Sequence, residues 1–191
     1  MKTRESGMPE ESYWETFFDP ECIAKRMGAD ASCGNVVEFG CGYGTFTVPV
    51  AAAVSGTVYA LDIDPEMIVA TEARTRNVNL ANVRVIRRDL MADGPGLPDA
   101  TCDLALLLNM LHCEEPVTHL REAYRNLRPG GRVAIIHWIH DPATPRGPSL
   151  AVRPKPEQCR AWAEEVGFVW ERDENLTCCA YHWGLVLRRL E

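Results

Sequence analysis

The sequence predicts an α/β protein with a doubly wound, mostly parallel, seven-stranded sheet and helices on both faces. Three observations support this fold class. Short apolar or β-branched runs alternate with helical stretches, which implies right-handed crossovers between parallel strands. The run CDLALLL, residues 102–108, is apolar almost throughout, as expected of a central strand covered on both faces. The first strand also runs directly into a glycine-rich turn. The expected arrangement is therefore Rossmann-like.

The expected elements follow one another along a single domain, residues 1–191. Strands are predicted at 36–39, 57–62, 83–87, 102–108, 132–137, 169–173 and 181–188. Helices are predicted at 45–54, 66–77, 116–126 and 156–165. Pro65 suits the first turn of the second helix, and Pro129-Gly130-Gly131 is expected to end the helix before the fifth strand.

The last two strands are joined by a short polar stretch, residues 174–180, with no room for a helix. Parallel neighbours need a crossover of a dozen or more residues. This connection therefore predicts a hairpin, with an antiparallel last strand on an otherwise parallel sheet.

Two segments outside the sheet are candidates for ligand contacts. Residues 12–30 are predicted to form an N-terminal helical cap, whose aromatic side chains either cover a sheet edge or roof a pocket. Residues 140–156 contain five prolines and three basic residues. A long loop at the carboxyl end of a strand is where α/β proteins usually contact their substrates.

Composition narrows the class of partner. The net charge is −7, without basic blocks, which argues against a nucleic-acid partner and favours a small molecule. The chain has no 18-residue apolar run and no signal-peptide core near its start, so a cytoplasmic location without membrane insertion is expected.

The eight cysteines include no C-x-x-C pair, and they are predicted to be reduced thiols that act as small apolar side chains. The adjacent Cys178 and Cys179 leave one alternative open, because neighbouring thiols can capture soft metals or metalloids. No other metal site is predicted.

The glycine turn follows the pattern G-x-G-x-G at Gly40, Gly42 and Gly44. Glycine lets the backbone approach a ligand closely. The dinucleotide fingerprint G-x-G-x-x-G would need a glycine at position 45, where this chain has Thr45, and no Lys-Ser or Lys-Thr pair marks a P-loop. The turn therefore indicates a cofactor loop of another type.

Together these residues resemble the class I S-adenosylmethionine-dependent methyltransferases, in particular the small members with little beyond the core domain. The resemblance covers most of the chain and rests on five motifs in the family's order. They are VVEFGCGYG at 36–44, the acid of ALDID at Asp62, Arg88-Asp89-Leu90, DLALLLNMLH at 103–112 and the turn LRPGGRVAIIHW.

The resemblance implies a binding site for S-adenosylmethionine. Asp62 would accept both ribose hydroxyls in charge-assisted bonds, or would instead cap the following helix, a role that suits Asp64 better. Asp89 and Leu90 would meet the adenine, and the glycine loop the methionine portion. The implied contacts are Glu38, Gly40, Cys41, Gly42, Tyr43, Gly44, Thr45, Phe46, Asp62, Ile63, Asp89, Leu90, Asn109, Met110 and Leu111.

Methyl transfer from a sulfonium is an in-line displacement, so the protein mainly orients and desolvates the reactants and a base is optional. His112, directly after the fourth strand, is the candidate base, although a lone histidine also serves as a structural group or a substrate donor. His137 and His140 are second candidates. Substrate contacts are expected from Tyr13, Trp14, Phe18, His137, Trp138, Arg146 and Arg153. The two arginines would clamp a carboxylate or phosphate, or else be solvated.

The expected function is methyl transfer from S-adenosylmethionine to a small molecule. A nicotinamide oxidoreductase and a non-catalytic cofactor-binding or partner subunit of the same fold are the alternatives. Methylation of a thiol or metalloid is a narrower variant, which rests on Cys178 and Cys179.

Overall fold

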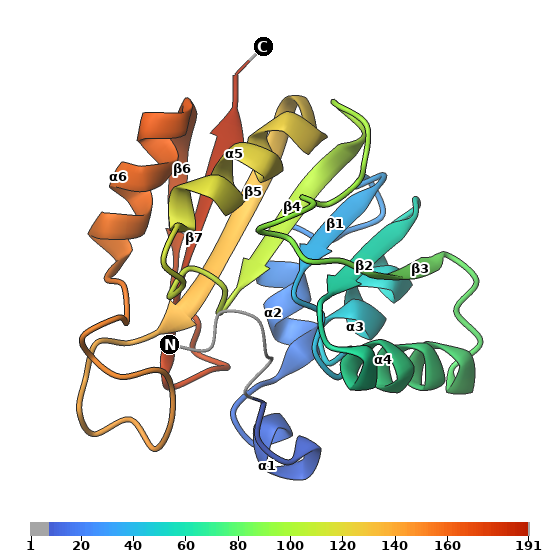
Figure 1. The fold of residues 1–191 in the computed structure, drawn as a ribbon, viewed down its shortest axis with the longest axis horizontal. Helices are drawn as coiled ribbons and strands as arrows, with labels where there is room; N and C mark the ends of the chain where they lie inside the picture. Colours follow the sequence, from blue (N-terminus) through green and yellow to red (C-terminus); the bar gives the residue numbers. More distant parts are fainter. Residues whose placement is uncertain (1–7, 191) are drawn as a thin grey trace.

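The computed structural model describes residues 8–190, which form one mixed seven-stranded sheet with helices on both faces (Figure 1). The strand order is β3-β2-β1-β4-β5-β7-β6. The strands are β1 (Val36–Phe39), β2 (Val58–Asp62), β3 (Val83–Arg87), β4 (Cys102–Leu108), β5 (Leu127–Trp138), β6 (Phe168–Glu174) and β7 (His182–Arg189). The helices are α1 (Glu11–Glu15), α2 (Pro20–Arg26), α3 (Thr47–Ala53), α4 (Pro65–Asn77), α5 (Pro116–Asn126) and α6 (Pro156–Val166).

Strands β1 to β5 pair in parallel, and β7 runs antiparallel to both β5 and β6. The hairpin predicted from the short connection is therefore confirmed. Strand β7 lies between β5 and β6, so the edge of the sheet on this side is β6. The Rossmann-like fold class is confirmed as well.

The sheet divides the core into two layers, because successive side chains of a strand point to opposite faces. In β4, Leu104, Leu106 and Leu108 pack against the layer formed with α2 and α3, whereas Ala105 and Leu107 pack against the layer formed with α5 and α6. The helices α3 and α4 also contact each other. The central strand is thus buried on both sides, as its apolar run predicts.

Three boundaries differ from the sequence prediction by more than one residue. The N-terminal cap consists of two short helices, because Pro20 starts α2 anew and Asp19 caps it by accepting a hydrogen bond from the Cys22 amide at 3.0 Å. Helix α3 begins at Thr47 because the glycine turn extends to residue 46. The Pro129-Gly130-Gly131 turn lies inside β5, which begins at Leu127 and shifts its register on β4 there.

The prediction that all cysteines are reduced was wrong for one pair. Cys22 of α2 and Cys178 of the β6–β7 connection form a disulfide across 156 residues. Cys179 is a buried free thiol whose Sγ donates to the Phe17 carbonyl at 3.2 Å. Cys178 and Cys179 therefore do not present two free thiols together. Within residues 8–190 no group of three or more His, Cys, Asp or Glu side chains is arranged to hold a metal.

None of the helices between residues 8 and 190 combines the length and the apolar character needed to cross a membrane.

Candidate active site

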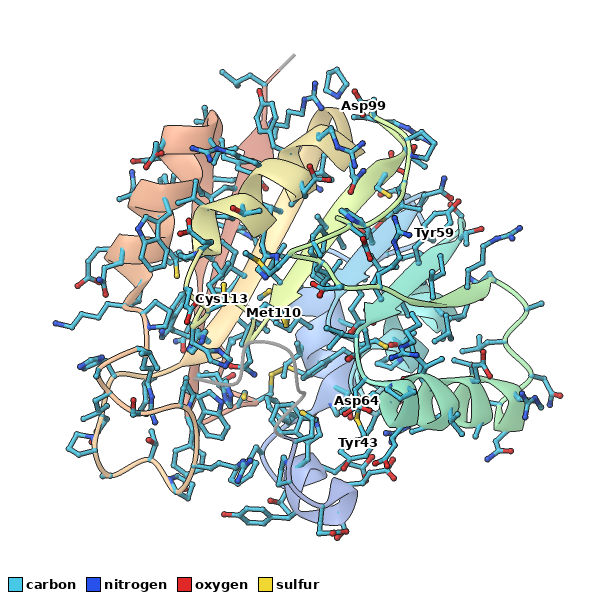
Figure 2. All side chains as sticks on the ribbon, viewed as in Figure 1. Tyr43, Tyr59, Asp64, Asp99, Met110 and Cys113 are labelled. Atoms are coloured by element: carbon cyan, nitrogen blue, oxygen red, sulfur yellow. A yellow bond between two sulfur atoms is a disulfide. The ribbon has the colours of Figure 1, made fainter. Side chains whose placement is uncertain are left out.

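A cavity of about 160 Å³ opens at the carboxyl ends of the parallel strands, where ligands bind in open α/β sheets. It brings together residues that the sequence places after four different strands. The predicted site residues that line it are Trp14, Gly40, Cys41, Gly42, Phe46, Asp62, Ile63, Asp89, Leu90, Asn109, Met110 and His112. Figure 2 shows Met110 and Cys113 at the carboxyl end of β4.

The glycine loop after β1 is held by the neighbouring strand. The amides of Gly40 and Cys41 both donate to the Leu61 carbonyl, at 2.8 and 2.9 Å. Gly40 has φ +75°, and a Cβ there would lie 2.4 Å from Met110 Sδ. Gly44 also has φ +75°, and a Cβ there would lie 3.0 Å from Thr71 Oγ1. The loop therefore requires glycine at both positions, because each has a positive φ and a Cβ at either would collide with a neighbouring side chain.

Asp62 ends β2 with a carboxylate that the backbone holds in place. Its Oδ2 accepts from the Gly42 amide at 2.9 Å and its Oδ1 from the Asp64 amide at 3.0 Å. The side chain lines the cavity, and burial is the main cause that raises its pKa. Each carboxylate oxygen can accept a further bond, so the group retains acceptor capacity for two ligand hydroxyls. The cap of α4 is Asp64, which accepts from the Glu66 amide at 2.9 Å.

Glu38 lies behind the glycine loop, on β1, and is almost fully buried. Its Oε2 accepts from the Thr47 hydroxyl at 2.5 Å, whereas its Oε1 has no hydrogen-bond partner among the described residues. Burial raises the pKa of Glu38 to about 8. The side chain thus braces the start of α3, and its contact with the cofactor stays a prediction.

The turn after β3 presents its residues to the cavity in a fixed conformation. Asp89 Oδ1 accepts from the amides of Met91 and Ala92, at 3.1 and 3.0 Å. Leu90 is buried beside it. This turn can offer both backbone and carboxylate groups to the edge of a nucleobase such as adenine.

His112 and Asn109 form the polar wall at the end of β4. Asn109 has φ +60°, and its side-chain Oδ1 and Nδ2 are buried without a partner in the described structure. The Nδ1 of His112 lies 3.2 Å from the Nε2 of His137. Burial lowers the pKa of both imidazoles. Unpartnered polar atoms beside a cavity fit a polar ligand such as the cofactor.

Several predicted site residues lie outside the cavity lining. Glu38, Tyr43, Gly44, Thr45, Leu111, Tyr13, Phe18, His137, Trp138, Arg146 and Arg153 are not among the residues that line it. The Tyr43 hydroxyl donates to the Pro9 carbonyl at 2.8 Å. Phe18 packs against Phe46 and His182, with ring centroids 5.0 and 4.7 Å apart. Most of the cap aromatics therefore fasten the cap to the sheet, and of them Trp14 reaches the cavity.

Arg153 is a structural brace, which corrects the prediction of a substrate clamp. Its guanidinium donates to the carbonyls of Pro148 at 2.7 Å and Ile139 at 2.8 Å, and to the Thr144 hydroxyl at 2.5 Å. The residue is 6% exposed. Since its donors serve the 140–156 loop, they are not directed at a ligand.

The cavity also contains residues that the sequence did not single out, namely Met8, Arg88, Met91, Leu108, Cys113 and His119. Four of them directly adjoin predicted site residues in the sequence, so their position in the chain could have marked them as cavity residues. These four are Arg88, Met91, Leu108 and Cys113. His119 lies one turn into α5, and its Nδ1 is buried with no hydrogen-bond partner in residues 8–190. Met8 is far from every motif, and only the fold brings it here.

A family model described as "Methyltransferase domain" matches residues 37–135, just over half of the chain. The chain belongs to this family. The methyltransferase is also similar to a solved SAM-dependent methyltransferase from Aquifex aeolicus, with 26% identity and a TM-score of 0.81, covering 95% of this chain and 94% of that one. The cofactor that this membership implies is S-adenosylmethionine.

Two curated relatives differ in what they act on. A ribosomal protein L11 methyltransferase from Methylococcus capsulatus is 34% identical over 60% of this chain and 36% of its own length. A demethylmenaquinone methyltransferase from Geobacillus is 33% identical over 61% of this chain and 50% of its own length. The matched part thus spans half or less of these relatives. The fold is also that of the [4+2]-cyclase SpnF, with a TM-score of 0.75 at 16% identity over 97% of this chain and 84% of that one.

Proposed function

We propose that this methyltransferase transfers the methyl group of S-adenosylmethionine to a small-molecule acceptor, with His112 as the base. The observation that carries the proposal is the cavity in which the glycine loop, Asp62 and His112 meet. When bound, the cofactor supplies a methyl carbon that its sulfonium has already activated. The chain therefore needs to bind, orient and desolvate the reactants.

The residues present fit the cofactor. Asp62 has the acceptor capacity for two ribose hydroxyls, and the turn at Asp89 has backbone and carboxylate groups for an adenine edge. The glycine loop, whose backbone is open to the cavity, would hold the methionine portion. Trp14, His112 and Cys113 would then face the acceptor.

A small acceptor is supported by the cavity itself and by the net charge of −7. The demethylmenaquinone relative suggests this class, whereas the ribosomal protein L11 relative makes a protein acceptor the second candidate. The thiol or metalloid variant loses support because Cys178 is bonded to Cys22. The cytoplasmic location expected from the sequence stays a prediction.

Calorimetry with S-adenosylhomocysteine tests the cofactor, and release of S-adenosylhomocysteine from S-adenosylmethionine with fractionated metabolites tests transfer. Transfer with a metabolite fraction of low molecular mass supports the proposal. Binding without transfer to any metabolite fraction points to the non-catalytic alternative, and transfer only to a protein fraction points to the second candidate. Binding of NADH without binding of S-adenosylhomocysteine would restore the oxidoreductase alternative.

A further inference from the structure

One histidine in the cavity wall belongs to none of the sequence motifs. His119 lies one turn into α5 and is only 3% exposed, yet it lines the cavity. Neither nitrogen of its ring has a hydrogen-bond partner among the described residues. Nδ1 is fully covered whereas Nε2 is not. The polar atom that the imidazole can present to the cavity is therefore Nε2.

Helix α5 packs along the segment that follows β3. Arg125 Nη1 donates to the Leu97 carbonyl at 2.8 Å. Three residues earlier on both segments, a Cβ at Gly94 would lie 3.1 Å from Glu122 Oε2. The two segments thus run in the same direction, side by side, with residues of decreasing number facing each other.

The same packing places His119 beside the turn after β3. His119 precedes Glu122 by three residues, so it lies on the same face of α5, one turn nearer the helix start. The next step along the paired segments reaches Leu90 and Met91, which line the same cavity as His119. The imidazole also meets the ring of Phe39 edge-on, with 6.2 Å between centroids, and Phe39 and Leu90 share one buried cluster. The imidazole therefore stands at the end of the cavity formed by this turn.

The protonation state of His119 limits what it can bind. Burial lowers the pKa of the ring, and no charge or hydrogen bond of the described residues opposes this effect. The ring is therefore neutral at pH 7, with one donor and one acceptor nitrogen. It offers no charge to a carboxylate. A neutral group with both donors and acceptors, such as the edge of a nucleobase, suits it better.

We infer that His119 is a cofactor-binding residue, whose Nε2 forms a hydrogen bond with the adenine of S-adenosylmethionine. The inference rests on the proposed function, which places the adenine at the turn with Asp89. Adenine carries an amino donor and acceptor ring nitrogens, so Nε2 finds a partner in either tautomer. The bond would satisfy a ring that the free protein leaves without one. His119 then adds to the selection of an adenine nucleoside, because a site built around a hydrogen bond rejects a ligand that cannot form it.

Nuclear magnetic resonance of the wild type with S-adenosylhomocysteine tests the contact directly. We expect nuclear Overhauser effects between the ring protons of His119 and the H2 or H8 proton of adenine, and a shift of the Nε2 resonance on binding. A His119→Gln variant assigns the histidine signals. Overhauser effects from His119 to the ribose or homocysteine protons alone, or to no proton of the ligand, overturn the inference.

Two substitutions separate the hydrogen bond from the packing of the ring. His119→Leu removes both nitrogens at similar size, whereas His119→Gln keeps a polar atom near the place of Nε2. The leucine variant should bind S-adenosylhomocysteine roughly 5- to 100-fold more weakly, because a buried group of the adenine loses its partner. The glutamine variant should lose less. An unchanged affinity of the leucine variant, or equal losses in the two variants, overturns the inference.

Glu122→Gln is the matched control on the same face of α5, outside the cavity lining, and it should leave the affinity unchanged. If it weakens binding as much as His119→Leu does, the packing of α5 is the cause and the inference is wrong. In the free protein, His119→Leu should not lower the Tm, since the nitrogens that it removes have no partner. A Tm lowered by leucine but not by glutamine would show a bond to the protein itself and would also overturn the inference.

The wild-type spectra decide even if a variant does not fold. They also separate this inference from the proposed function. Failure of the wild type to bind S-adenosylhomocysteine refutes the proposed function and this inference with it. Binding without contact between His119 and the adenine refutes this inference alone.

Discussion

Asp62→Ala should weaken the fold and the cofactor site together. The carboxylate accepts two backbone amides, from Gly42 and Asp64, at 2.9 and 3.0 Å. Hydrogen bonds to a charged group contribute about 1.5–3 kcal/mol each. Burial, which raises the pKa of Asp62, offsets part of this sum. We therefore expect the free energy of unfolding to fall by roughly 2–4 kcal/mol.

The loss of cofactor affinity follows from the same carboxylate. If it accepts two ribose hydroxyls, its removal costs about 3–6 kcal/mol of binding, or roughly a 10²- to 10⁴-fold weaker Kd. Calorimetry with S-adenosylhomocysteine measures the affinity, and urea unfolding measures the stability.

Asp64→Ala is the matched control, two residues away. Asp64 caps α4 through the Glu66 amide, so its loss should cost about 1 kcal/mol of stability and leave the affinity nearly unchanged. If Asp62→Ala binds S-adenosylhomocysteine as tightly as Asp64→Ala does, the assignment of Asp62 to the cofactor is refuted. Should the alanine variant not fold, Asp62→Asn, which keeps one acceptor, provides the same comparison.

Three further predictions concern stability. Glu38, with a pKa of about 8 in the fold, holds a proton that the unfolded chain releases near pH 4.3; stability should therefore fall by up to about 1.4 kcal/mol per pH unit as pH rises between about 4.5 and 8. Urea unfolding of Glu38→Gln should show a flatter slope, and equal slopes would contradict this account. Cys22→Ser removes a disulfide that spans 156 residues, so the free energy of unfolding should fall by up to about 5 kcal/mol. In reductant the variant and the wild type should have the same Tm, and a lower Tm of the variant there would show that the loss has another cause. Arg153→Met should speed proteolysis within residues 140–156, since it removes several donors to loop carbonyls, whereas unchanged cleavage would refute the brace.

The order of elements was predictable from the sequence because each signal is local. Apolar runs marked the strands, Pro65 stands at a helix start, and the short 174–180 connection required a hairpin. The spacing of Gly40, Gly42 and Gly44 indicated a cofactor loop, because the backbone conformation of a turn depends on its own residues.

Contacts between distant segments were not predictable in this way. Three such contacts depend on how the segments outside the sheet pack onto it. They are the disulfide between Cys22 and Cys178, the hydrogen bonds of Arg153 to its own loop, and the position of Met8 in the cavity lining. The contact between His112 and His137 depends on the register of β4 on β5, and the sequence of either strand alone does not specify that register. The sequence by itself determined the fold class and the strand ends that carry the site, since these follow from local periodicity and turn chemistry. The tertiary structure decided which side chains meet there, because the distances between residues far apart in the chain are fixed only when the strands pair in one register.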